Sequence, residues 1–146
     1  MGRVLGLDVG DRRIGVALSD EGRRIASPHS VYQRVGYGPD TRYFLALAKE
    51  QGVAYIVAGL PYNMDGSLGG QADKVRAFCD QLAAAGLEVR YIDERLTTRA
   101  AERVLLEADL SRSRRRKVID KMAAVFILQG YLDALALKDK NENRLD

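Results

Sequence analysis

The feature that most constrains the fold is an apolar segment with one carboxylate inside it, Val4-Leu5-Gly6-Leu7-Asp8-Val9-Gly10. Three charged residues separate it from a second short apolar segment, residues 14–18. Apolar runs bounded by glycine and charged turn residues predict two β-strands, and the short connection predicts an antiparallel hairpin. Because side chains alternate along a strand, Asp8 should share its face with Gly6 and Gly10. A metal ion, a phosphate or a nucleic-acid strand could approach the open backbone there.

Asp8 also has a simpler interpretation. An aspartate near a strand end can cap a turn or pair with Arg12 or Arg13, which follow it closely. Inside a strand, however, a carboxylate is disfavoured and is costly to bury unless a cation compensates it. A functional role and a structural role for Asp8 therefore both remain open from this segment alone.

Composition limits the remaining possibilities. The chain has 146 residues, 47% of them hydrophobic, which is enough for one domain with a substantial core. The single cysteine, Cys79, excludes an internal disulfide and a multi-cysteine zinc site, and the single His29 excludes a histidine-rich metal site. No apolar run is long enough to span a membrane, so we expect a cytoplasmic protein without a membrane partner. The net charge of +3 is small, but the basic residues are clustered.

The rest of the chain predicts a mixed α/β architecture. A third strand, interrupted by Pro28, should complete an antiparallel meander, and helices should then alternate with two buried strands. The expected later elements are a helix at 40–51, a strand at 53–58, a helix over 71–85, a strand at 88–92, a helix near 98–108 and a long helix at 118–137. This order predicts a five-stranded sheet, with a three-stranded meander plus two parallel strands and helices on both faces. We expect residues 1–138 to form one domain and residues 139–146 a charged, disordered tail.

Three carboxylates interrupt apolar patterns in three different elements. Asp8 lies in the first strand, Glu94 follows the last strand beside Asp93, and Asp120 lies on the packing face of the last helix. If they converge they must repel one another unless a cation lies between them. Oxygen ligands without histidine or cysteine suit Mg²⁺ or Mn²⁺, and two such ions can promote phosphodiester cleavage. Separate surface caps and salt bridges are the alternative explanation for these acids.

Four segments together resemble the signature blocks of the YqgF/RuvX family. They are residues 5–17 around Asp8, residues 59–67 (Gly-Leu-Pro-Tyr-Asn-Met-Asp-Gly-Ser), residues 93–98 (Asp-Glu-Arg-Leu-Thr-Thr) and residues 120–124 (Asp-Lys-Met-Ala-Ala). The resemblance covers about residues 1–138 and implies an RNase H-like fold. It also implies a nuclease linked to 5′-end maturation of pre-16S rRNA, with Asp8, Glu94 and Asp120 as catalytic acids. From their oxygen ligands we expect these acids to hold two Mg²⁺ or Mn²⁺ ions together with the substrate.

Basic and polar residues near these acids are the candidate nucleic-acid contacts. A basic segment precedes Asp120, two arginines follow Asp8, one adjoins Glu94, and the loop 63–70 could clamp the substrate. The candidates are Arg12, Arg13, Asn63, Arg95, Arg112, Arg114, Arg115, Arg116 and Lys117. A solvated charged face and a plain connecting loop are the alternative explanations.

Four functions fit some of these features. The first is a metal-dependent nuclease acting on structured RNA, with a ribosomal RNA precursor as its partner. The second is a resolvase that cuts branched DNA, and the third is a non-catalytic RNA-binding factor of ribosome assembly. The fourth, an actin-like or sugar-kinase-like ATP-binding protein, needs two such domains and does not fit 146 residues. Either a monomer or a homodimer is compatible with the sequence.

Overall fold

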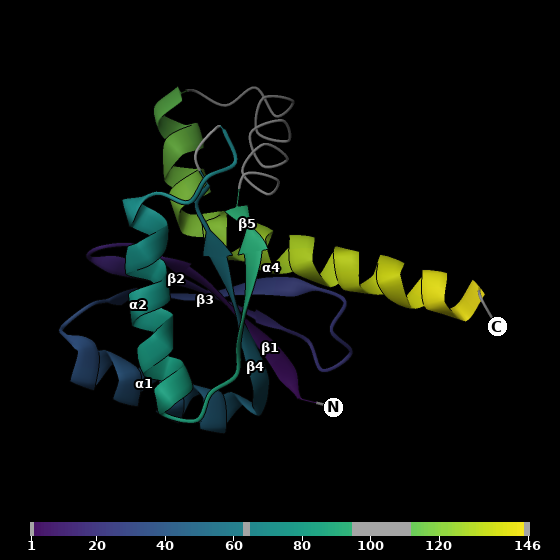
Figure 1. The fold of residues 1–146 in the computed structure, drawn as a ribbon, viewed down its shortest axis with the longest axis horizontal. Helices are drawn as coiled ribbons and strands as arrows, with labels where there is room; N and C mark the ends of the chain where they lie inside the picture. The colour runs from purple at the N-terminus through teal and green to yellow at the C-terminus, as the bar shows by residue number, and fades with distance from the viewer. Residues whose placement is uncertain (1, 63–64, 95–111, 145–146) are drawn as a thin grey trace.

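The computed structural model of the chain describes residues 2–62, 65–94 and 112–144 (Figure 1). Within the last of these segments, side chains are described for residues 122–141. The helix expected near 98–108, and the candidate contacts Asn63 and Arg95, lie outside the described residues.

A five-stranded mixed sheet forms the centre of the molecule, with strand order β3-β2-β1-β4-β5. β1 pairs antiparallel with β2, and β2 with β3, whereas β4 runs parallel to both β1 and β5. The predicted meander with two added parallel strands is therefore confirmed. The elements are β1 (Arg3–Val9), β2 (Arg13–Ser19), β3 (Ala26–Gln33), α1 (Tyr37–Gln51), β4 (Val53–Leu60), α2 (Gly70–Ala84), β5 (Val89–Asp93) and α4 (Arg112–Arg144).

Helices cover both faces of this sheet, as the sequence predicts (Figure 1). The first core lies between the sheet and the pair α1 and α2, and it includes Leu5, Leu7 and Phe78. The second core lies between the opposite face and α4, and it includes Val4 and Leu128. Because side chains alternate along β1, the two cores receive alternate residues of that strand. This places Asp8 on the face that α4 covers.

Two glycines of the sheet allow α4 to approach closely. A Cβ atom on Gly6 would lie 2.7 Å from Cβ of Leu128, and one on Gly59 would lie 2.7 Å from Cδ1 of Ile127. Real Cβ atoms do not approach other atoms so closely. A side chain at position 6 would push the backbone of α4 away, and one at position 59 would displace the side chain of Ile127. The glycines of the first and second signature blocks thus set the distance between α4 and the sheet.

The last helix is longer than its apolar pattern predicts. It begins at Arg112, so residues 112–117, expected to be a polar connection, form its first turns. Arginine and lysine favour helices, and no glycine or proline interrupts this segment. Residues 139–144, expected to be a disordered tail, are the end of the same helix, which projects beyond the sheet (Figure 1). A single domain over residues 1–138 stays a prediction.

Pro28 lies in β3, which is an edge strand of the sheet. Its pairing with β2 shifts register between Val16 and Ala17, so that Ser30 and Pro28 face consecutive residues and His29 is the extra one. Proline is tolerated at edges and bulges because it has no N–H to donate, and this strand offers both. Among the described helices, none combines the length and the hydropathy needed to cross a membrane.

Candidate active site

Asp8 lies near the carboxyl end of β1, directly across from Gly15 of β2. It is half-buried, and its Cβ lies 3.5 Å from the position that a Cβ on Gly15 would occupy. The same position on Gly15 lies 3.5 Å from Cβ of Ala124 in α4. Asp8 therefore lies beside a glycine gap where β1, β2 and α4 meet, as the spacing of Gly6, Asp8 and Gly10 suggests.

Glu94 reaches the same region from the other side of β4. It follows β5, and a Cβ on Gly59 of β4 would lie 3.6 Å from Cβ of Glu94. Burial, together with the nearby charges of Asp8 and Asp93, raises the pKa of Glu94 to about 7. Asp8, Asp93 and Glu94 thus lie within electrostatic reach of one another. The structure brings together two of the three predicted acids, with Asp93 beside them.

Asp120 is placed only by its backbone. It lies in α4 one helical turn before Ala124, which contacts the Gly15 gap next to Asp8. Its side chain lies outside the described residues, so its convergence with Asp8 and Glu94 stays a prediction.

The described acids fit a hard divalent cation in their chemistry. Their donors are carboxylate oxygens, which Mg²⁺ and Mn²⁺ prefer, and their mutual repulsion would be relieved by a cation between them. Among the side chains that the structure describes, no group of three histidines, cysteines or acids is arranged to hold a metal ion. A complete set of ligands therefore needs residues beyond Asp8 and Glu94, and Asp120 is the candidate.

The predicted basic contacts are spread over several segments. Arg12 and Arg13 are exposed in the β1–β2 turn, which is held by hydrogen bonds from Gly10 N–H to Arg13 O (2.9 Å) and from Arg34 N–H to Arg12 O (2.9 Å). The basic segment 112–117 forms the first turns of α4 and so precedes Ala124 in the same helix. Both segments flank the acids along the chain, and contact with nucleic acid stays a prediction for them.

The loop after β4 shows a local structure of its own. Oδ1 of Asp65 accepts hydrogen bonds from Ser67 N–H (2.9 Å) and Ser67 Oγ–H (2.6 Å), and Tyr62 forms an isolated β-bridge with Leu68. Asp65 in this loop and Asp93 beside Glu94 are two further acids in the signature blocks. The pKa of Glu94 responds to Asp93, so Asp93 is the one that the structure places near the pair.

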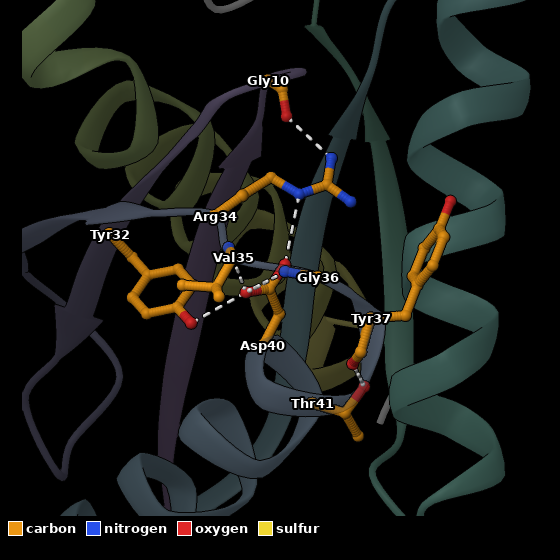
Figure 2. A network of polar contacts seen from close by, with 8 residues as sticks. All are labelled: Gly10, Tyr32, Arg34, Val35, Gly36, Tyr37, Asp40 and Thr41. Atoms are coloured by element: carbon orange, nitrogen blue, oxygen red, sulfur yellow. Dashed lines mark hydrogen bonds and ion pairs between the residues drawn. The ribbon is translucent and has the colours of Figure 1, made fainter.

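A buried network beside the β1–β2 turn does not emerge from the sequence (Figure 2). Asp40 of α1 is fully buried and accepts hydrogen bonds from Tyr32 Oη–H (2.8 Å), Val35 N–H (2.9 Å), Gly36 N–H (3.4 Å) and Arg34 Nε–H (3.5 Å). Burial opposes ionisation of Asp40, but these donors together hold its pKa below the ordinary value.

Arg34 links this network to β1. Its Nη1 donates a hydrogen bond to the carbonyl of Gly10 (3.0 Å), two residues after Asp8. An acidic residue in the first turn of a helix is a visible sequence signal, but its pairing with Arg34 depends on how the β3–α1 connection folds back. The hydrogen bond between Arg34 and Gly10 therefore cannot be predicted from local sequence patterns.

Comparison with known proteins gives a consistent result along most of the chain. The model of a family described as "RuvX: Holliday junction resolvase" matches residues 2–134. A protein of Clostridioides difficile named "Putative pre-16S rRNA nuclease" is 54% identical over 133 residues, covering 90% of this chain and 94% of the relative. A protein of Moorella thermoacetica with the same name is 55% identical over 134 residues, covering 91% and 96%.

Two solved structures resemble the fold at low identity. The first is T. thermophilus RuvC in complex with Holliday junction substrate, with a TM-score of 0.58 and 14% identity over 93% of this chain and 97% of that one. The second is Fowlpox virus resolvase with Holliday junction DNA, with a TM-score of 0.51 and 8% identity over 91% and 98%. At such identities the likeness concerns the fold alone, and it confirms the predicted RNase H-like architecture.

Proposed function

Because the chain belongs to the RuvX family, we propose that it is a metal-dependent endonuclease that acts in 5′-end processing of pre-16S rRNA. The names of the relatives support the nuclease activity and the RNA substrate. The structural observation that carries the proposal is the electrostatic coupling of Asp8 and Glu94 across β4. An acid with a raised pKa that lies close to a carboxylate from another strand is typical of active sites.

Asp8, Glu94 and Asp120 would hold Mg²⁺ or Mn²⁺. The ions, two of them when substrate is bound, would activate a water molecule and stabilise the leaving oxygen during phosphodiester hydrolysis. Asp8 is suited to hold a cation because Gly15 leaves space beside it. Glu94 must lose the proton that its raised pKa lets it keep near neutral pH before it can act as a ligand.

The basic residues would bind the phosphodiester backbone on either side of these acids. Arg12 and Arg13 lie on the β1–β2 turn just beyond Asp8, and the segment 112–117 precedes Asp120 by less than three turns of α4. We assign the same role to Asn63 and Arg95, which flank the carboxyl ends of β4 and β5 in the chain. The activity would take place in the cytoplasm, by a monomer or a homodimer.

A second candidate is cleavage of branched DNA. It is favoured by the description of the family as a Holliday junction resolvase and by the fold shared with RuvC. A non-catalytic RNA-binding factor is less well supported, because a pure binder would gain affinity by losing the negative charges at Asp8 and Glu94.

One experiment separates these functions. The purified protein is incubated with a pre-16S rRNA fragment, a four-way DNA junction and a linear DNA duplex, each with Mg²⁺, Mn²⁺ or a chelator. We expect cleavage of the RNA with either metal and none with the chelator. Cleavage of the junction alone would establish the second candidate, and binding without cleavage of any substrate would overturn both nuclease proposals.

A further inference from the structure

A pocket of about 410 Å³ lies beside the β1–β2 turn, on the α1 and α2 side of the sheet. It is formed by that turn, the β3–α1 connection and α2. Its lining residues are Asp11, Arg34, Val35, Gly36, Tyr37, Asp40 and Lys74. Figure 2 shows the ring of Tyr37 extending from the start of α1 toward α2, with the guanidinium of Arg34 nearby.

The charges that line this pocket compensate one another. Nε of Arg34 lies 3.5 Å from Oδ2 of the buried Asp40, and Nζ of Lys74 lies 3.6 Å from Oδ1 of Asp11. The lining therefore has two cations and two carboxylates, so a phosphate would find no excess positive charge. The polar groups instead suit a neutral ligand that has both hydrogen-bond donors and acceptors.

The mouth of the pocket presents flat and apolar surface to solvent. Val35 is 76% exposed and Tyr37 is 51% exposed, although both are large hydrophobic residues. The guanidinium of Arg34 lies 5.7 Å from the centre of the Tyr37 ring and 4.9 Å from that of Phe78. Aromatic rings and guanidinium planes are the surfaces on which unpaired nucleobases stack.

Arg34 is held rigidly, which favours binding. Its side chain is only 16% exposed and is fixed by hydrogen bonds to Asp40 and to the Gly10 carbonyl. A ligand that contacts it therefore causes little loss of side-chain entropy. Among the described residues, no hydrogen-bond partner is found for Nη2 of Arg34, so this donor is free to bind a base edge.

The pocket lies at the same end of β1 as the candidate active site, but on the opposite face of the sheet. Gly10, whose carbonyl Arg34 binds, is two residues beyond Asp8, a distance of about 7 Å along a strand. We propose that the pocket binds one unpaired nucleobase of the substrate strand, stacked on Tyr37, where the strand passes around the end of β1. This inference rests on the proposed nuclease function and adds a preference for substrates that contain a single-stranded segment.

The test measures binding of a single-stranded RNA oligonucleotide and of a blunt duplex, in chelator so that no cleavage occurs. Tyr37→Ala should weaken binding of the single strand about 5- to 150-fold, the effect of losing one stacked base, and should leave duplex binding unchanged. Tyr37→Phe keeps the ring and should stay within twofold of the parent. Ile25→Ala removes another exposed apolar side chain, at a different pocket, and is the matched control.

A base-removal series locates the contact. An abasic residue is moved along the oligonucleotide, and at one position it should weaken binding to the parent as much as Tyr37→Ala does. The abasic residue at that position should not weaken binding to Tyr37→Ala any further. The fluorescence of 2-aminopurine at the same position should be quenched by the parent protein but not by Tyr37→Ala. Equal binding by parent and Tyr37→Ala, with nucleic-acid cleavage intact, would overturn the base-binding pocket while leaving the proposed function standing.

A free nucleotide is the other possible source of a base. Adenosine 5′-monophosphate should compete with the oligonucleotide only at millimolar concentration if the pocket serves a strand. Micromolar binding of the mononucleotide that depends on Tyr37, without competition by the oligonucleotide, would overturn the proposal. If the parent neither binds nor cleaves any nucleic acid, the proposed function and this inference both fail.

Discussion

Burial and the carboxylate of Asp8 on β1 together raise the pKa of Glu94, which follows β5, although β4 lies between the two strands. Gly59 of β4 has no side chain to fill the space beside Glu94, and Gly15 of β2 leaves space on the other side of Asp8. Two acids that destabilise each other's charged forms are costly for folding alone. The arrangement is explained if a cation occupies the site during function.

The first prediction concerns Glu94 in the metal-free protein. Its pKa of about 7 lies above the ordinary value of 4.5, so the folded state holds this proton more tightly than the unfolded state. The stability that the proton contributes is complete below pH 4.5 and is lost as the pH rises through about 7. Glu94→Gln should therefore raise the free energy of unfolding at pH 8, by up to about 3 kcal/mol, and change it little at pH 4.

Denaturant titrations at both pH values, with and without Mg²⁺, measure this difference. Mg²⁺ should stabilise the parent and not Glu94→Gln, because only the parent has a negative charge at position 94 to bind the ion. The same stability change at pH 4 and pH 8 would show that Glu94 is not perturbed as described.

The second prediction concerns Asp40. Because its pKa is held below the ordinary value of 3.8, its contribution to stability is present above that pH and is lost as the pH falls through the folded-state pKa. Asp40→Asn should destabilise the protein by about 2–4 kcal/mol at pH 7, since Arg34 would lose its buried carboxylate. The difference should shrink toward pH 3, and a difference independent of pH would contradict an ionised Asp40.

The third prediction tests the glycine at the α4 interface. Gly6→Ala would place a Cβ 2.7 Å from Cβ of Leu128, and should destabilise the protein by about 1–3 kcal/mol through overpacking. Gly70→Ala is the control, because no atom lies within 4 Å of its Cβ position. Thermal melts should separate the two variants, and equal melting temperatures would show that α4 has room to move.

The fourth prediction concerns the basic segment at the start of α4. Replacing Arg114, Arg115 and Arg116 together by alanine should weaken nucleic-acid binding and reduce the slope of log K against log salt by about one unit per lost phosphate contact. A double replacement of Lys138 and Lys140, which are exposed on the projecting end of α4, should leave the slope unchanged. If the triple variant binds like the parent at every salt concentration, the segment is only a solvated face.

Much of this architecture could be predicted from the sequence because local patterns specify it. The alternation around Asp8, the Gly-rich hairpin and the continuous apolar strand 53–58 predict which faces are buried and the mixed sheet that results. The position of Pro28 on an edge strand and the burial of Cys79 follow from the same rules. The meeting of Asp8 with Glu94 was predictable because the carboxyl ends of parallel strands share one edge of a sheet.

Other features depend on contacts that no local pattern encodes. The first turns of α4 have no apolar periodicity, so hydrophobic patterns do not predict that the helix begins at Arg112. The helix propensity of arginine and lysine explains this start instead. The link from Asp40 through Arg34 to Gly10 joins three segments and depends on the fold of the β3–α1 connection. The pocket at Tyr37 arises from the same connection and was not predictable for the same reason.

Cleavage by Asp8→Asn tests the central claim most directly. The substitution keeps the size of the side chain and removes the charge that would hold the cations, so cleavage with Mg²⁺ should fall by orders of magnitude. The melting temperature without metal should be equal to or above that of the parent, because repulsion with Glu94 is relieved, and nucleic-acid binding should be retained. Cleavage at the rate of the parent would remove Asp8 from the mechanism, and loss of folding would show that its role is structural.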